Sequence, residues 1–259
     1  MANADGVPLL DVSGVTLRYR TKNNMVTATE RVGFQVSQGD RVVLLGPSGC
    51  GKSTLLKAVG GFLKPSEGSI TLKGRLVEGP GPDRVMVFQE FDQLLPWKTV
   101  LENVAFGMIA SRTFSKDEAF ARAREAIRTV HLEKFSDTYP HTLSGGMKQR
   151  VAIARCLAMK PDIILMDEPF AALDALSRRR MQDELLELWR ECRFTMLFVT
   201  HSIDEALLLG SKIVVMSPHP GRVEEVLEAT QLNEAAGSHP EIAERIRRVL
   251  FRDAPDYVI

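Results

Sequence analysis

The sequence predicts an α/β fold with a mainly parallel sheet, a small antiparallel β subdomain and an inserted helical subdomain. Short apolar runs typical of buried parallel strands occur on both sides of residues 92–159, where the pattern is mostly helical. A glycine-rich turn joins one of these runs to a helix. Residues 8–36 instead alternate apolar and polar side chains, as half-buried antiparallel strands do.

Composition excludes several classes of protein. The 259 residues suffice for one large domain, and their 44 % hydrophobic content is that of a soluble globular protein. The formal net charge is zero and no run of five like charges occurs, which argues against a nucleic-acid partner. No apolar run approaches the ~18 residues that a membrane span needs, and Met1–Asp5 lack the features of a signal peptide. Three scattered cysteines suit a reducing cytosol.

The first predicted strands lie in residues 8–36. Val15, Leu17 and Tyr19 share one face of a strand, and Val32, Phe34 and Val36 share a face of the next. The pattern leaves two interpretations of Tyr19 open, a core aromatic or a binding residue.

A phosphate-binding loop follows the first buried strand, Arg41–Leu45. Residues 46–53 fit G-x-x-x-x-G-K-[ST], and a helix is expected over 52–59. The glycines let backbone N–H groups surround phosphate oxygens, Lys52 reaches the β- and γ-phosphates, and the Ser53 hydroxyl binds Mg²⁺. This motif predicts a P-loop NTPase of the RecA-like type. The residues expected at the nucleotide are Gly46, Pro47, Ser48, Gly49, Cys50, Gly51, Lys52, Ser53 and Thr54. Cys50 is either a thiol-sensitive position or a small residue in a tight place.

Further elements follow in order. Strands are expected at 69–72, 85–88, 163–166, 196–199 and 213–216, and helices at 100–108, 116–130, 147–159 and 177–191.

Polar residues stand where the apolar strands end. Gln89 follows one strand, Asp167 and Glu168 follow another, and Thr200 and His201 a third. The carboxyl ends of parallel strands share the sheet edge at which α/β proteins bind ligands. Asp167 is therefore expected to hold Mg²⁺, and Glu168 to deprotonate the attacking water. His201 is expected to donate to the γ-phosphate or to position this base.

A second helix start is also built for an anion. Ser144 is a good N-cap, yet Gly145 and Gly146 occupy the first helical positions, where each costs up to ~1 kcal/mol relative to Ala. Close approach to a phosphate would justify that cost. Because one nucleotide seldom needs two such ends from one domain, the spacing hints at a nucleotide shared between two chains.

In this order, the motifs resemble the nucleotide-binding subunit of an ABC transporter. They are Gly46–Ser53, Gln89, Leu143-Ser144-Gly145-Gly146, Asp167-Glu168-Pro169, Ala172-Leu173-Asp174 and His201. The resemblance implies a head-to-tail homodimer, with ATP and Mg²⁺ between the P-loop of one subunit and Ser144–Gly146 of the other. It also implies that Tyr19 stacks on adenine, Gln89 reaches the Mg²⁺ site and Asp174 lies at the dimer interface. Met147 and Ala171 depart from the commonest pattern without removing a phosphate-binding group.

Three further stretches, 88–97, 200–206 and 216–222, resemble the nitrate, sulfonate and taurine importer branch. This narrower match implies integral membrane permease subunits and, indirectly, a periplasmic or extracellular solute-binding protein. The subunit would then be peripheral, on the cytoplasmic face of the inner membrane.

The alternative is a soluble ABC ATPase of DNA repair or translation. The repair type inserts coiled coils between the P-loop and the motif that corresponds to Leu143–Gly146. The translation type usually carries two ATPase cassettes in one chain. A P-loop kinase or GTPase would not need the second glycine-rich helix start, and no N-K-x-D sequence occurs.

We expect a single ABC ATPase domain in three parts. Residues 8–91 and 160–222 form the nucleotide-binding core with the β subdomain, residues 92–159 the helical subdomain, and residues 223–259 a helical tail. The apolar stretch 91–97 either fills the seam between the subdomains or accepts a permease helix. The apolar face of the tail, with Ile242 and Ile246, either packs on its own domain or binds a partner.

Overall fold

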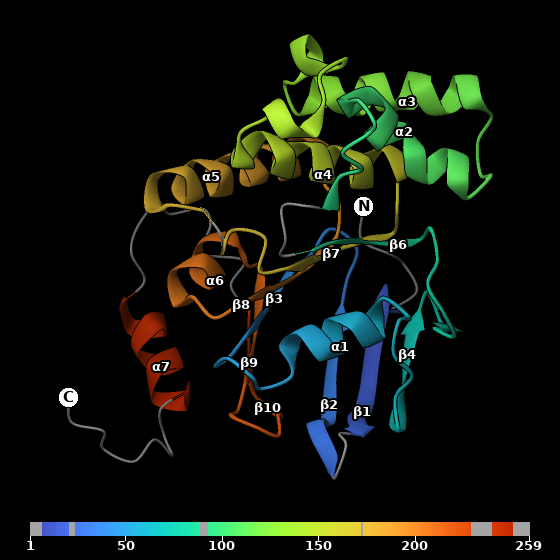
Figure 1. The fold of residues 1–259 in the computed structure, drawn as a ribbon. Helices are drawn as coiled ribbons and strands as arrows, with labels where there is room; N and C mark the ends of the chain where they lie inside the picture. Colours follow the sequence, from blue (N-terminus) through green and yellow to red (C-terminus); the bar gives the residue numbers. More distant parts are fainter. Residues whose placement is uncertain (1–6, 21–23, 89–92, 172, 229–239, 251–259) are drawn as a thin grey trace. The chain divides into compact units, whose positions relative to one another are not determined.

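The computed structural model describes residues 7–20, 24–88, 93–171, 173–228 and 240–250 (Figure 1). The chain forms two compact units, Met1–Pro80 with Thr195–Ile259, and Gly81–Phe194. Gln89 and Ala172, both among the predicted motifs, lie outside the described residues.

An antiparallel sheet forms one part of the first unit. Its strands lie in the order β2-β1-β4-β5. Their bounds are β1 Leu10–Arg20, β2 Met25–Val36, β4 Glu67–Leu72 and β5 Arg75–Leu76. In β2, Val32, Phe34 and Val36 are buried while the residues between them are exposed, which confirms the alternation predicted there.

Strand β1 departs from simple alternation. Its pairing with β2 shifts register at three places between Val12 and Arg18, and Val15, Thr16 and Leu17 are all buried. Tyr19 lies beyond the shift and is 48 % exposed. The prediction that Tyr19 shares the face of Val15 and Leu17 is therefore wrong, because the irregular pairing changes which side chains point inward.

The parallel strands of the first unit position the P-loop. Strand β3, Arg41–Leu45, pairs in parallel with β8, Met196–Thr200, and with β9, Lys212–Met216. Every residue of β3 and β8 is buried, as expected of parallel strands covered on both faces. Because Leu45 pairs with Thr200, the P-loop and His201 leave the sheet at the same edge. The helices of this unit are α1 Lys52–Val59, α6 Ile203–Leu209 and α7 Pro240–Leu250.

The predicted helical tail begins instead with a strand. Residues Val223–Glu228 form β10, which pairs antiparallel with β9. Glu224 and Glu228 are exposed on this edge strand, where charged residues suit a strand that must not pair further. Glu225 is partly exposed and pairs with Arg245 of α7. Helix α7 follows and packs on α6 and β9 of its own unit, with Ala243 and Ile246 buried, so its apolar face is a packing face.

The second unit combines two parallel strands with helices. Strand β6, Arg84–Val87, pairs with β7, Ile163–Asp167. Helices α2 Val100–Ala110, α3 Lys116–Thr129 and α4 Gly145–Met159 pack side by side (Figure 1), and α5 spans Ala175–Cys192. Two short 3₁₀ turns, Glu133–Phe135 and Pro140–Thr142, connect α3 to α4. No helix in the described part of the chain is both long and apolar enough to cross a bilayer.

Candidate nucleotide-binding site

The P-loop requires glycine where it turns into α1. Gly51, the N-cap of α1, has φ 95°, and a Cβ there would lie 2.6 Å from the Ala28 carbonyl oxygen. Gly49 also has a positive φ, 81°, with open space where its side chain would be. Since only glycine takes these conformations readily, the loop geometry explains both residues. The first N–H groups of α1 then point out of the helix start, where an anion can accept them.

Lys52 is held by the loop that it follows. Its side chain is buried, and Nζ donates to the carbonyl oxygens of Gly46, at 2.7 Å, and Pro47, at 2.8 Å. Nζ also lies 3.9 Å from the Cys50 sulfur, a weak acceptor that a phosphate oxygen can replace. Ser53 and Thr54, in the first turn of α1, are partly exposed and carry hydroxyls at the same helix end.

Cys50 is a packing residue of the loop. It is buried, and burial raises the pKa of its thiol against the opposing effect of Lys52. A Cβ on Gly46 would lie 2.9 Å from the Cys50 sulfur, and one on Gly221 only 2.0 Å from its carbonyl oxygen. Of the two interpretations of Cys50, the small residue in a tight place is the one that this packing supports.

His201 leaves β8 through a hydrogen-bonded turn. The Thr200 hydroxyl donates to Glu205 Oε2 at 2.6 Å, and accepts from the Ser202 N–H at 3.0 Å. Ser202 caps α6 by accepting from the Glu205 N–H. These bonds fix the residues on both sides of His201, which is exposed. Tyr19 is also exposed on this unit, so its aromatic face is open to stacking.

In the second unit, the predicted acidic pair stands where β7 ends. Asp167 is the last residue of the strand and is 7 % exposed. Glu168, partly exposed, has φ 42°, a left-handed conformation that costs a non-glycine residue roughly 1–2 kcal/mol. Backbone strain of this kind concentrates at functional sites, and here it turns the glutamate out of the strand direction.

Residues Ser144–Gly146, the second glycine-rich helix start, begin α4 as the sequence predicts. Ser144 is the N-cap, and its hydroxyl accepts from the Met147 N–H at 3.3 Å, which leaves the hydroxyl proton for another acceptor. Ser144 is exposed, and the two glycines are partly exposed. This helix start is therefore open to an anion.

Asp174 begins α5 in the same unit. Its Oδ1 accepts from the N–H groups of Leu176, at 3.1 Å, and Ser177, at 3.0 Å. The hydrogen bonds from Ser177 hold the pKa of Asp174 below its ordinary value. The first turn of α5 also carries Leu176, which is 82 % exposed.

Sequence reasoning missed Asn103, a buried side chain of α2. Its Oδ1 accepts from the Leu95 N–H at 2.7 Å, and its Nδ2 donates to the carbonyl oxygens of Leu95, Lys98 and Thr99. Asn103 thereby fixes the loop that presents Trp97. An asparagine in an otherwise apolar helix was the available signal, together with the capping box of Thr99 and Glu102.

The comparisons with known proteins agree with this geometry. The family model described as "ABC transporter" matches residues 29–171. The chain belongs to the ABC transporter family. It is 54 % identical to the taurine import ATP-binding protein TauB of Rhizobium johnstonii over 76 % of this chain and 75 % of that protein. An uncharacterized ABC transporter ATP-binding protein of Methanocaldococcus jannaschii is 47 % identical over 85 % of this chain and 81 % of its own length.

Solved ABC structures share the fold. An ATP-binding cassette dimer in a post-hydrolysis state with ADP and Pi has a TM-score of 0.72 and 34 % identity, covering 85 % of this chain and 98 % of its own. The cbiO1 protein of Clostridium perfringens, part of the ABC transporter complex cbiONQ, has a TM-score of 0.76 and 28 % identity, covering 95 % and 96 %. The predicted fold class is confirmed, and this ABC ATPase binds and hydrolyses ATP.

Proposed function

We propose that this ABC ATPase works as a head-to-tail homodimer that binds ATP between two chains and powers uptake of a small sulfonate such as taurine. The observation that carries the shared site is the second glycine-rich helix start. Ser144 caps α4 and is exposed, in a unit that does not contain the P-loop. A helix N-terminus of this kind stabilises an anion, and we propose that a second chain supplies it.

The phosphate-binding groups of this chain belong mainly to the P-loop. Lys52, held by two loop carbonyls, supplies a point charge toward the β- and γ-phosphates. The Ser53 hydroxyl and the Asp167 carboxylate are oxygen donors of the kind that Mg²⁺ takes, so these residues fit the ion. Gln89 is proposed as a further oxygen donor. When bound, Mg²⁺ neutralises charge on the phosphates.

Glu168 is proposed as the general base, and His201 as its helper. The carboxylate of Glu168 follows a buried strand directly, so the rigid strand positions it to accept a proton from water. His201 stands at the end of β8 between hydrogen-bonded neighbours, where it can donate to a phosphate or orient the base. The aromatic ring of Tyr19 is proposed to stack on adenine, and Asp174 to contact the second subunit.

Import of a sulfonate rests on similarity to relatives named for taurine import, among them TauB of Rhizobium johnstonii at 54 % identity. The proposed partners are therefore integral membrane permease subunits and, through them, a solute-binding protein. The ATPase would sit peripherally at the cytoplasmic face of the membrane. Trp97 is 70 % exposed on a loop fixed by Asn103, which suits a surface that receives a permease helix.

One experiment tests the transport proposal. The chain is co-purified with the permease encoded beside it and reconstituted in liposomes, and ATP hydrolysis is measured with taurine and the solute-binding protein. We expect stimulation by taurine and not by an amino acid of equal size that lacks the sulfonate. Equal hydrolysis with and without every sulfonate tested, in a complex that does assemble, would contradict the substrate class.

A further inference from the structure

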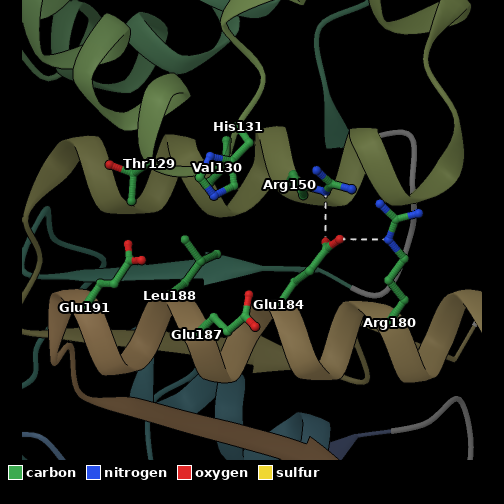
Figure 2. Close-up of a pocket in the computed structure, with 9 residues that line it drawn as sticks. All are labelled: Thr129, Val130, His131, Arg150, Arg180, Glu184, Glu187, Leu188 and Glu191. Atoms are coloured by element: carbon green, nitrogen blue, oxygen red, sulfur yellow. Dashed lines mark hydrogen bonds and ion pairs between the residues drawn. The ribbon is translucent and has the colours of Figure 1, made fainter.

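The carboxylate of Glu184 on α5 lies between two arginines. Its Oε2 is 2.9 Å from Arg150 Nε on α4, and its Oε1 accepts from Arg180 Nε at 3.0 Å (Figure 2). The Arg150 and Glu184 side chains are only 18 % and 23 % exposed, whereas Arg180 is 75 % exposed. The pair between Arg150 and Glu184 is therefore the shielded one, and water screens it less than an ordinary surface pair.

This ion pair ties together two helices that each begin at a predicted contact of the shared site. Arg150 lies in the second turn of α4, which starts after Ser144, and Glu184 lies in the third turn of α5, which starts after Asp174. One turn nearer the start of α4, a Cβ on Gly146 would lie 3.5 Å from the Met181 sulfur. From this contact to the ion pair, the chain advances four residues along α4, from Gly146 to Arg150. It advances three residues along α5, from Met181 to Glu184. The two helices run in the same direction, with their N-termini at the same end.

A cavity lies beside this ion pair, between α5 and the residues that end α3, and Arg150 is its lining residue from α4. Its volume is about 250 Å³, and buried Val130 and Leu188 contribute apolar walls (Figure 2). Glu187 and Glu191 also line it. The cavity removes contacts with which packing would otherwise surround this part of α5. The ion pair joins α4 to α5 at the edge of this cavity.

We propose that Glu184 is a positioning residue that acts through Arg150 to set the start of α4 relative to the start of α5. Ser144 and Asp174 then meet the second subunit in one fixed geometry. A displacement of about 1 Å at a reacting site can cost two orders of magnitude in rate, so a modest shift of α4 is enough to matter. The inference rests on the proposed function, since it assumes that both helix starts face the shared nucleotide.

The chain offers two matched controls on the same helix. Asp183 pairs with Arg179 at 3.3 Å, but both side chains are more than half exposed and lie on α5 alone. Glu187 lines the same cavity, and among the described residues it forms no ion pair with Arg150 or Arg180. Asp183→Asn and Glu187→Gln each remove one negative charge from α5, as Glu184→Gln does, without removing the connection to α4.

The test compares Glu184→Gln with these controls in the full chain. We expect Glu184→Gln to keep wild-type ATP affinity and one ATP per chain, because the P-loop is untouched, while kcat falls by about tenfold. In a Glu168→Gln background, where ATP-bound dimers should accumulate, Glu184→Gln should also weaken ATP-dependent dimerisation in sedimentation. The two controls should change neither. Arg150→Gln should reproduce the defect, and adding Glu184→Gln to it should cost nothing further.

Three outcomes overturn the inference. In the first, Glu184→Gln matches Glu187→Gln in kcat and dimerisation. In the second, its losses add to those of Arg150→Gln, so that Glu184 does not act through that residue. A fall in melting temperature with a reduced ATP stoichiometry would also contradict it, because the residue would then only maintain the fold. Failure of the proposed function is separable, since Glu168→Gln alone would then form no ATP-dependent dimer.

Discussion

Lys52 and Glu168 are proposed to carry different parts of the chemistry, and the structure shows a different constraint on each. Lys52 is held by two loop carbonyls, whereas Glu168 is held in a left-handed backbone conformation after β7. The sequence predicted the role of Lys52 from the P-loop motif and that of Glu168 from its place after an apolar strand. It could not show that the loop pre-positions the lysine, because that depends on two backbone oxygens whose direction only the folded loop sets.

We expect Lys52→Ala to weaken ATP binding about ten- to a hundredfold, since hydrogen bonds to a charged group contribute ~1.5–3 kcal/mol. Titration with a fluorescent ATP analogue measures this affinity. Lys57→Ala, an exposed lysine on the same helix, is the matched control and should bind normally. Wild-type ATP affinity in the Lys52→Ala variant would contradict the assignment of residues 46–53 as the phosphate-binding loop.

Glu168→Gln keeps the shape of the side chain and removes the base. Hydrolysis should fall by ~10²-fold or more, the usual loss when a general base is removed, while ATP still binds. Phosphate release under single-turnover conditions reports the chemical step directly. Asp167→Asn should instead shift the Mg²⁺ dependence of hydrolysis to higher concentrations. Unchanged phosphate release by Glu168→Gln would place the base elsewhere.

The three cysteines should react with a thiol reagent in the order of their exposure. Cys192 is exposed, whereas Cys50 and Cys156 are buried. Burial raises the pKa of all three thiols, that of Cys156 to about 12. The thiolate is the reactive form, so a raised pKa lowers its fraction at any pH below that pKa. At pH 8 we expect Cys192 to react first and Cys156 only on unfolding, as mass spectrometry of timed samples would show. Early labelling of Cys156 would contradict its burial.

At the scale of elements, the sequence predicted what has a strong local pattern. The start of α4 at Gly145 follows from the N-cap Ser144, and the buried strands β3, β7 and β8 follow from their apolar runs. Strand β10 was missed, because its glutamates break the apolar period and its pairing with β9 decides its conformation. The ion pair between Arg150 and Glu184 could not be predicted from the sequence either, since it depends on how two helices pack.

The loop after residue 92 tests the contact between this subunit and a permease. Leu94 is buried, but Trp97 is 70 % exposed, so Trp97 does not fill a core of the isolated chain. We expect Trp97→Ala to leave ATP binding and the melting temperature nearly unchanged and to weaken assembly with the permease, by ~2 kcal/mol if Trp97 is a hot spot. Pull-down from solubilised membranes measures assembly.

The control for this prediction is Leu94→Ala, a core truncation on the same loop. It should lower stability by ~2–5 kcal/mol, and with it the melting temperature. A comparable loss of melting temperature in Trp97→Ala would mean that the tryptophan is structural, and docking through it would then be wrong.

At the scale of the whole molecule, one chain contains two glycine-rich helix starts in two separate units, and both are proposed to bind phosphate. The family model and the dimeric solved relatives explain why a single sequence carries both. Sequence alone predicted the shared nucleotide from the two glycine-rich starts. It could not fix the dimer geometry, because the contact lies between chains and leaves no periodic signal in either.

The most direct test of the shared site mixes two inactive subunits. Ser144→Arg places bulk and charge at the start of α4 but leaves the P-loop of its own chain intact, and Lys52→Ala does the reverse. Each variant alone should hydrolyse ATP poorly. A mixed dimer should recover one working site, built from the P-loop of the Ser144→Arg chain and the α4 start of the Lys52→Ala chain. If mixed dimers form but their hydrolysis stays at the level of the separate variants, the site shared between two chains is contradicted.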